Sequence, residues 1–335
     1  MKRTFFPLLA AAALLVTAFS GAADAEIRTR NLQLGHALSN NPNDNYHMLS
    51  VAFSESLKKL SGGKIAVEVF ASAQLGNERE MIEGEKIGTI EMAVIGNASL
   101  APFVKQCMVV DLPFMFPNSP AAHKVLDGPA GQKLFAAMEK NGIKPLAWGE
   151  GGFRHLINRL RPVKTPGDIA GMKLRAVENP LFIDTYKALD SNPTPMAWPE
   201  TFTGLQQKTI DGLDIPITVI YTNKFNEIAD YLSLTAHFYN ALVITMSNQV
   251  WKSFNAEEQK IILQAAQEAS ATQRKFVMEN EQKFVDDMAG KGLNVNKDID
   301  FPAFQSKMGV VYTKYGKEIG QDMVDMFIKA VNDSK

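Results

Sequence analysis

Cysteine is almost absent from this chain: Cys107 is the only one among 335 residues. A single thiol has no partner for an internal disulfide, and its position far from the N-terminal region excludes a lipid-anchored N-terminus. We therefore expect Cys107 to be a small buried apolar residue.

An excess of charge is also missing, since 35 basic and 36 acidic side chains give a net charge of −1. This balance gives no electrostatic reason to expect nucleic acid or an anionic bilayer as partner, so we expect a small molecule or another protein.

Long apolar runs are missing beyond the N-terminal region, where none approaches the roughly 18 residues that a membrane span needs. The chain begins with Lys2 and Arg3, continues with an apolar run from Phe5 to Phe19, and reaches small residues at Ala23 and Ala25. This layout is typical of a secretory signal peptide, which we expect to occupy residues 1–25. The remaining 335 − 25 = 310 residues predict a soluble exported protein with two ordinary domains or one large one.

Signatures of catalysis and metal binding are also missing. The five histidines are scattered without the spacing of a metal-binding motif, which argues against zinc. There is no nucleophile elbow and no Walker loop, and Gly149–Phe153 (GEGGF) lacks the spacing of a phosphate-binding turn. Asp211 and Asp214 offer an acid/base pair, but Asp-Gly is first of all a turn signal. We therefore expect no metal, no cofactor and no enzyme active site.

The sequence does contain a regular alternation of short strands and helices. Apolar spacing predicts a strand at 31–35, a helix at 45–60, a strand at 64–70, a helix at 78–87 and a strand at 90–95. Further along it predicts a helix at 130–141, strands at 143–148 and 172–174, and a helix at 180–189. Such alternation is typical of an α/β fold with a largely parallel sheet.

One predicted element is much longer than the others, because nothing breaks a helix from Glu257 to Ala289. Asn255 and Glu258 form the pattern of a capping box at its start, and two glycines follow its end. A helix of this length reaches about 50 Å at 1.5 Å per residue, enough to brace two lobes. Two helices joined by a kink are the alternative. Since no flexible linker is found, a second domain has to be formed by chain crossings.

Two arginines stand where a permanent charge needs a partner. Arg175 ends the strand at 172–174 in GMKLRAVENP, and Arg154 follows the strand at 143–148 in GFRHLIN. A guanidinium matches a carboxylate through two parallel hydrogen bonds, and open α/β sheets bind ligands at the carboxyl ends of their strands. The residues alone leave two interpretations open, namely ligand-binding arginines or exposed ion pairs that contribute less than about 1 kcal/mol each.

Longer segments carry a resemblance to a known family. They are GGFRHLINRLRPVKTPGDIAGMKLRAVENP, NPTPMAWPETFTGLQQKTIDGLDIP, LGHALS, SGGKIAVEVFASAQLGNERE, VVDLPFMF and LTAHFYNALVITMSNQVW. Together they strongly resemble the substrate-binding proteins of TRAP transporters, DctP type, over nearly the whole chain after residue 25. The resemblance implies a two-lobed α/β periplasmic binding protein fold with mixed sheets, a ligand cleft between the lobes and a long helix spanning both. One lobe would contain residues 26–151 and about 241–280, and the other residues 152–240 and about 281–335.

The resemblance also implies a function. By this resemblance the protein would close on a small organic acid, such as a sugar acid, in the periplasm and deliver it to TRAP permease subunits in the membrane. We expect it to act as a monomer. Two alternatives stay open. One is an exported lyase or isomerase acting on carboxylated sugars, with Asp214 or Glu78 as base and Arg175 as the substrate clamp. The other is a sensor module that presents the bound ligand to a membrane receptor.

The resemblance assigns roles to individual residues. Arg175 matches the family arginine that forms the salt bridge with the ligand carboxylate, and Arg154 matches the arginine that assists it. Trp198 matches an aromatic residue that lines the pocket, with a place in the core as its alternative role. Glu78 matches an acid that meets ligand hydroxyls or amines, although an acid at a helix start is equally explained by the helix dipole.

The chain departs from the family pattern in its ligand-binding segments. Many members read D-G-Q-E-N-P where this chain reads DGLDIP, so Ile215 replaces a ligand-binding asparagine and the polar contact is lost or moves to Asp214. Gly96 and Ala37 stand where some sugar-acid binders carry polar side chains, which predicts a roomier or more apolar pocket. The predicted ligand-binding set is completed by their neighbours, Asn97 and His36.

Overall fold

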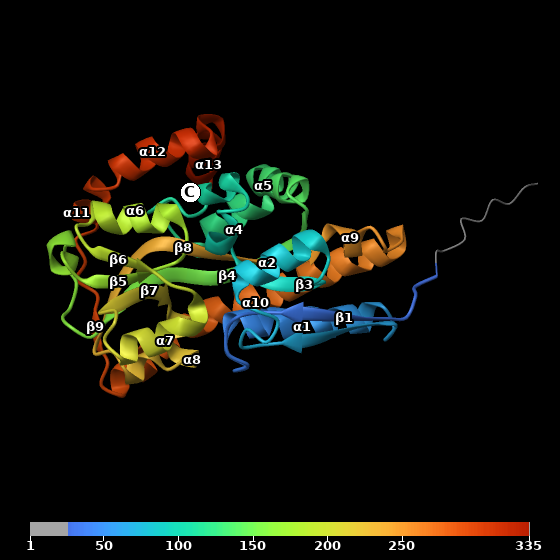
Figure 1. The fold of residues 1–335 in the computed structure, drawn as a ribbon, viewed down its shortest axis with the longest axis horizontal. Coiled ribbons are helices and arrows are strands. Elements are labelled where there is room, and N and C mark those ends of the chain that lie inside the picture. The colour runs from blue at the N-terminus through green and yellow to red at the C-terminus, as the bar shows by residue number, and fades with distance from the viewer. Residues whose placement is uncertain (1–25, 335) are drawn as a thin grey trace, which may run out of the picture.

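The computed structural model describes residues 26–334, so the predicted signal peptide lies outside the described residues. Within them, one nine-stranded sheet is covered by helices (Figure 1). The strands are β1 (Arg30–Gly35), β2 (Ile65–Phe70), β3 (Met92–Gly96), β4 (Ile143–Asn158), β5 (Lys173–Ala176), β6 (Asn192–Pro195), β7 (Gly212–Pro216), β8 (Tyr231–Ser247) and β9 (Asn294–Asn296). The helices are α1 (Asn45–Leu60), α2 (Glu78–Ile87), α3 (Asn97–Leu100), α4 (Ser119–Asp127), α5 (Pro129–Lys140), α6 (Pro180–Ala188), α7 (Trp198–Gln206), α8 (Ile217–Thr222), α9 (Asn248–Trp251), α10 (Ala256–Gly290), α11 (Phe301–Ser306), α12 (Gly309–Ile319) and α13 (Gln321–Asn332).

The sheet has the order β2-β1-β3-β8-β4-β7-β5-β6, with β9 paired to β8. At one side β2, β1 and β3 are parallel, and at the other side β7, β5 and β6 are parallel. Between these groups the pairs β3–β8, β8–β4 and β4–β7 are antiparallel. The mixed α/β fold class is therefore confirmed, while the largely parallel sheet predicted from the alternation holds for the two outer groups alone.

The sheet divides the molecule into two halves that the chain joins by crossing between them. We call β1–β3 with α1–α5 the first half and β5–β7 with α6–α8 the second half. In Figure 1 the second half lies on the left and the first half on the right, and the long strands β4 and β8 run through both. The crossing strands β4 and β8 connect the two halves.

The long helix is confirmed as one continuous element of 35 residues, α10. Its start is held by the predicted capping box of Asn255 and Glu258. It packs against α1 in the first half and α8 in the second, where Tyr221 stacks on Phe284 with ring centroids 4.4 Å apart. The helix therefore braces both halves.

The C-terminal helices contact both halves as well. α12 packs against α6, while α13 packs against α4 and α5. The Tyr312 hydroxyl on α12 donates to the Pro113 carbonyl oxygen at 2.9 Å. Since residues 309–332 touch both sides, the lobe boundary placed near residue 281 stays a prediction.

The strand expected at 143–148 is wrong at its carboxyl end, because β4 continues to Asn158. It pairs with β8 over this whole length, with register shifts around Gly152. A Cβ atom at Gly151 would lie 2.1 Å from Asn240 Nδ2 on β8, so glycine is required there for close packing inside the strand. Arg154 consequently lies within a central strand rather than at the end of one.

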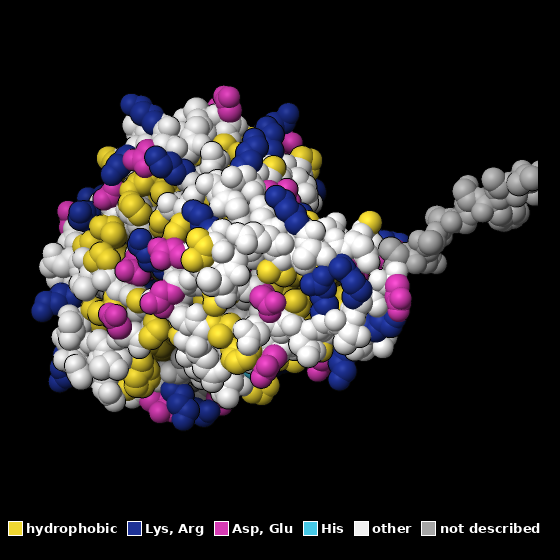
Figure 2. All heavy atoms as spheres, turned by 45° about the vertical axis from the view of Figure 1, so that its right-hand side comes forward, with side chains coloured by type: hydrophobic (Ala, Val, Ile, Leu, Met, Phe, Trp, Pro, Cys, Tyr) yellow, Lys and Arg dark blue, Asp and Glu magenta, His cyan; other side chains and the backbone are white. Residues whose placement is uncertain are grey.

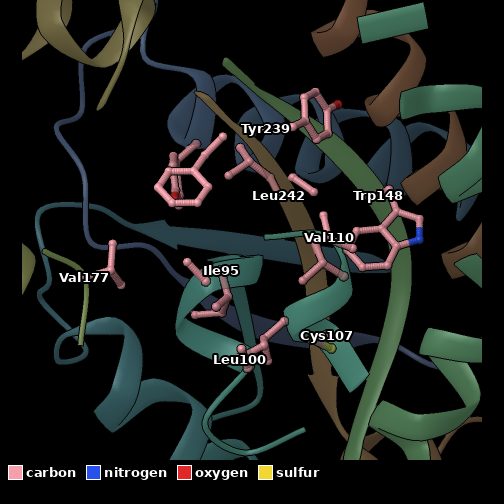
Figure 3. Close-up of a cluster of buried hydrophobic side chains, with 14 of the residues drawn as sticks. Ile95, Leu100, Cys107, Val110, Trp148, Val177, Tyr239 and Leu242 are labelled. Carbon is pink, nitrogen blue, oxygen red and sulfur yellow. The ribbon is translucent and has the colours of Figure 1, made fainter. Parts of the chain in front are cut away.

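Cys107 is buried, as predicted. It lies on a short 3₁₀ helix, Lys105–Val109, in the same apolar cluster as Leu100, Val110 and Trp148 (Figure 3). Burial raises the pKa of its thiol well above the ordinary value, so the group is neutral and unreactive.

The surface carries charges of both signs side by side over the face drawn in Figure 2. This distribution agrees with the near-zero net charge. Among residues 26–334, no helix combines the length and the apolar character needed to cross a membrane.

Candidate functional site

The carboxyl ends of the parallel strands face each other where the two halves meet. β1 and β3 end there from the first half, and β5 and β7 from the second. Fourteen residues from both halves line a hollow there with about 420 Å³ of empty space. An adjoining hollow of about 450 Å³ shares Glu78, Arg175 and Trp198 with it. We call the two together the central cavity. Its position agrees with the rule that open α/β sheets bind ligands at strand carboxyl ends.

Arg175 brings a positive charge without a carboxylate partner into this cavity. It is the third residue of β5, and 5% of its surface is exposed. Its Nε donates to the Met196 carbonyl oxygen at 3.0 Å, and the terminal guanidinium nitrogens have no hydrogen-bond partner among residues 26–334. Burial and the neighbouring Arg154 charge lower its pKa to about 10, so it stays protonated at neutral pH. The Nε contact holds the guanidinium fork in place and leaves its outer edge free for an anion.

Arg154 lines the same cavity, but its charge is already neutralised. Its Nε lies 2.5 Å from Asp214 Oδ2, and its terminal nitrogen NH2 donates to the Asp214 carbonyl oxygen at 2.5 Å. Burial alone would raise the pKa of Asp214, but the charges of Arg154 and His237 bring it below its ordinary value. The pair on the neighbouring strands β4 and β7 therefore adds polar groups to the cavity and almost no net charge.

Glu78 lies across the cavity from the arginines. It is the first residue of α2, and its Oε1 accepts a hydrogen bond from the Gly96 N–H at 2.7 Å. Its Oε2 accepts one from the Ser99 hydroxyl at 2.5 Å. Burial raises the pKa of Glu78 above its usual value. The capping box of α2 uses Asn77 and Glu80, so the helix start does not need Glu78 as a cap.

Trp198 and Ile215 form an apolar part of the cavity wall. Trp198 begins α7, is partly buried, and packs on Phe225 with ring centroids 5.6 Å apart. Ile215 on β7 is buried and lines the cavity from the second half. Its neighbour Asp214 points to the opposite side of the strand, because successive side chains alternate. For this reason Asp214 reaches Arg154 and does not line the cavity.

Gly96 lies at the carboxyl end of β3 and lines the cavity. The space predicted beside it is already used, because a Cβ atom there would lie 2.6 Å from the Tyr46 hydroxyl oxygen. Tyr46 and Asn240 also line the cavity, and sequence reasoning missed both. Asn240 had a signal, since it is a polar residue inside the apolar run FYNALVITMS. Tyr46 had none, because an aromatic residue at a helix start is as readily explained as core.

Three further predicted residues lie away from the central cavity. Ala37 lines a neighbouring hollow that shares Leu38 and Trp198 with it. The Asn97 amide points inward, where it donates to the Cys107 carbonyl oxygen and to Asp111 Oδ1, both at 2.9 Å. His36 is fully buried, with its Nε2 3.1 Å from His47 Nδ1. His36 and Asn97 directly follow Gly35 and Gly96, the last residues of β1 and β3, and of these two glycines Gly96 lines the central cavity.

The candidate site has no metal-binding character. Across the described part of the chain, no three or more His, Cys, Asp or Glu side chains gather in a way that could hold an ion. The cavity instead offers the unpaired guanidinium of Arg175, the partly buried carboxyl group of Glu78, hydroxyl and amide groups, and an indole wall. Chemically, this set fits a small anion that also carries hydroxyl groups.

Comparisons with known proteins agree with this geometry. Residues 34–318 match the family described as bacterial extracellular solute-binding protein, family 7. The chain is 34% identical over 319 residues to the 2,3-diketo-L-gulonate-binding periplasmic protein YiaO of Escherichia coli (strain K12), covering 95% of this chain and 93% of that protein.

Solved structures are similar over most of the chain. A TRAP periplasmic solute-binding protein from Polaromonas sp. JS666, bound to D-erythronate, has a TM-score of 0.86 and 35% identity, covering 89% of this chain and 98% of that one. The sugar acid binding protein DctPAm from Advenella mimigardefordensis, in complex with galactonate, has a TM-score of 0.89 and 29% identity, covering 92% and 100%.

Proposed function

Since this chain belongs to the bacterial extracellular solute-binding proteins of family 7, we propose that it closes on a hydroxylated monocarboxylic acid and presents it to the membrane subunits of a TRAP transporter. The class of function is that of the family, namely solute binding for a TRAP transporter. The alternative of an exported lyase or isomerase is set aside, because the family and its named relatives are binding proteins.

The observation that carries the proposal is the buried, unpaired guanidinium of Arg175. A charge removed from water is costly unless it is paired, and within residues 26–334 no carboxylate forms an ion pair with it. A ligand carboxylate would complete two parallel hydrogen bonds on its outer edge. Arg175 is then the primary anion-binding residue, and Arg154 is a secondary contact held by Asp214.

The charge balance of the cavity favours a ligand with one carboxylate. Arg154 is neutralised by Asp214, and the exposed Arg79 is paired with Glu83 at 3.1 Å, so Arg175 is the unpaired arginine among the cavity-lining residues. A second ligand carboxylate would meet Glu78 or an arginine that already has a carboxylate partner. Glu78, Ser99 and Asn240 are instead suited to hydroxyl groups, because they offer acceptors and donors at hydrogen-bonding positions. The similar proteins that bind D-erythronate, galactonate and 2,3-diketo-L-gulonate take acids of this kind.

Binding from both halves would also drive closure. A ligand shifts a conformational equilibrium through its greater affinity for one form, and here Arg175 lies in the second half while Glu78 lies in the first. The hinge would consist of the crossing strands β4 and β8 together with α10. Cleavage after Ala25, release into the periplasm as a monomer, and the division into residues 26–151 with about 241–280 and 152–240 with about 281–335 belong to the same proposal.

The acid itself should be recoverable. Protein purified from its exported form without refolding is expected to release an unmodified hydroxy acid, detected by mass spectrometry after heat denaturation. Titration calorimetry with D-erythronate, galactonate and 2,3-diketo-L-gulonate then ranks these three probes. Chemical conversion of a bound acid during incubation would contradict a binding role and revive the enzyme alternative.

A substitution at Gly96 tests the cavity and leaves every charged group in place. We expect Gly96→Ala to weaken binding by roughly tenfold to a hundredfold, because overpacking costs about 1–3 kcal/mol and the new Cβ meets Tyr46. Calorimetry with the best of the three probes measures the loss. Gly309→Ala is the matched control, since nothing lies within 4 Å of a Cβ at that position. Equal affinities for both variants would place the ligand elsewhere.

A further inference from the structure

Two buried carboxylates join the two halves of the molecule. Asp44 precedes α1, and Asp111 follows the 3₁₀ helix Lys105–Val109, both in the first half. Their exposed fractions are 0% and 2%, and neither lines the central cavity. Solute binding as described above uses neither of them, although burying a carboxylate is costly unless it gains hydrogen bonds.

Asp44 divides its two oxygens between the halves. Oδ1 accepts hydrogen bonds from the Tyr46 N–H at 3.0 Å and the His47 N–H at 3.4 Å, which caps α1. Oδ2 accepts from the Thr222 hydroxyl at 3.0 Å and the Asn223 amide at 3.1 Å, at the end of α8 in the second half, and from the Ser39 hydroxyl of the first half at 3.3 Å. Ser or Asn caps a helix as well as Asp does, so the cap alone does not call for a carboxylate.

Asp111 also accepts hydrogen bonds from both halves. Its Oδ1 accepts a hydrogen bond from the Asn97 amide at 2.9 Å within the first half. Its Oδ2 accepts one from the Asn179 amide at 3.3 Å, and Asn179 caps α6 in the second half. The same Asn179 amide donates to the Ala98 carbonyl oxygen of the first half at 3.0 Å. Each carboxylate is therefore anchored in one half and bonded by the other.

Both contacts lie beside residues that line the central cavity. Leu38 and Val219 line the cavity next to the Asp44 contact, since Ser39 also donates to Asp44 and Val219 precedes Thr222 on α8. Ala98 and Val177 line it next to the Asp111 contact. Residues beside both cross-half contacts therefore form part of the wall around a ligand in the cavity.

We propose that Asp44 and Asp111 are positioning residues for solute binding, which accept hydrogen bonds across the closing cleft and thereby slow release of the enclosed acid. The inference rests on the proposed closure around a ligand. It assigns the lifetime of the closed form partly to groups that never touch the ligand. Opening the cleft separates Asp44 from Thr222 and Asn223, and Asp111 from Asn179, while the helix caps stay intact.

The hydrogen-bond donors from the second half matter because they offset the cost of burying the Asp44 and Asp111 carboxylates. Burial raises the pKa of Asp44 to about 6, and the hydrogen bonds from Asn223 and Thr222 oppose this rise. Burial raises the pKa of Asp111 to about 7, opposed by Asn97, the charge of Arg154 and Asn179. Removing one donor leaves a buried carboxylate short of a partner in the closed form alone, because water replaces the donor once the halves part.

The sharpest test compares two threonines that differ in this contact. Thr222 and Thr185 are both buried, and each hydroxyl oxygen lies 2.8 Å from the carbonyl oxygen four residues earlier. The Thr222 hydroxyl alone also lies 3.0 Å from Asp44 Oδ2, so its single proton is shared between two acceptors. We expect Thr222→Val to release the best-binding acid among D-erythronate, galactonate and 2,3-diketo-L-gulonate about tenfold faster than wild type, with an unchanged association rate. Thr185→Val should keep both rates. Without ligand, both variants should stay folded, since each loses a local helical bond of its own element, and Thr222→Val also loses the bond from the Asn223 amide. Stopped-flow fluorescence and thermal unfolding measure these quantities.

Two further variants keep the helix caps and remove the cross-half bonds. Asp44→Asn retains a capping oxygen but turns an NH₂ group toward the Asn223 amide, donor against donor. Asn179→Ser retains the α6 cap without the amide that reaches Asp111. Both should accelerate release.

Unchanged release in all three variants, or an equal acceleration in Thr185→Val, would overturn the positioning role while leaving solute binding intact. Failure of the wild-type protein to bind any of the three probes, or to carry an acid on purification, would overturn the proposed function and this inference with it.

Discussion

Arg175→Ala should lose 30-fold to several-thousand-fold in affinity for the bound acid. Truncating one partner of a buried charged pair costs about 2–5 kcal/mol, and this range of affinities is the direct conversion. The structure gives the reason, since Arg175 is buried in the cavity wall and has no carboxylate of its own. Titration calorimetry against the acid released from the wild-type protein measures the loss. The variant should fold normally, because removing an unpaired buried charge relieves a desolvation cost.

Two controls separate charge from geometry at this position. Arg175→Lys keeps a positive charge but loses the planar fork, so we expect an affinity between those of wild type and Arg175→Ala. Arg161→Ala removes an arginine that is exposed and donates to the Asp168 carbonyl oxygen, and it should bind like wild type. Wild-type affinity in Arg175→Ala would remove the basis of the proposed function.

The elements that depend on local patterns could be predicted from the sequence. α1 and α2 have the expected bounds, and α10 extends the expected helix by one residue at each end. Each carries an apolar stripe and a recognisable start, such as the Asn255 and Glu258 capping box. These signals lie within a few residues of each other, so a single sequence is enough to read them.

The course of β4 could not be predicted, because its cause is not local. The strand was expected to end at residue 148, before the glycines of GEGGF, yet Gly151 packs against Asn240, which lies 89 residues later on β8. The resemblance to a family identified Arg154 as a cavity residue, although its predicted place at a strand end was wrong. A match to a family motif can identify a site residue even where the predicted bounds of a strand are wrong, since the match does not depend on the local apolar pattern.

The roles of charged residues were the hardest to predict. Arg175 and Arg154 look equivalent in the sequence, as two arginines near strands, but one is unpaired and the other is bound by Asp214. That difference depends on β7 pairing with β4, and on strand alternation turning Asp214 toward Arg154 and Ile215 toward the cavity. Asp214 was considered as a ligand contact or a catalytic base, and the structure gives it a neutralising contact instead.

Asp214→Ala is the substitution with the largest expected effect on stability. It leaves Arg154 buried in a central strand without its carboxylate, and breaking a buried pair in this way costs about 3–5 kcal/mol. The free energy of unfolding, measured by urea denaturation of ligand-free protein, should fall by this amount. Asp298→Ala breaks the exposed pair with Lys164 and should leave the free energy of unfolding almost unchanged.

The double variant Arg154→Leu/Asp214→Leu tests whether the pair serves stability or the site. Replacing a buried ion pair by apolar residues is often neutral for folding, so the double variant should recover most of the stability that Asp214→Ala loses. It should still bind the acid more weakly than wild type, because Arg154 lines the central cavity beside Arg175. If it binds as tightly as wild type, Arg154 makes no contribution to the ligand, and Arg175 alone holds the carboxylate. If its stability stays as low as that of Asp214→Ala, the cost arises from packing around β4 and β7 and not from the unpaired charge.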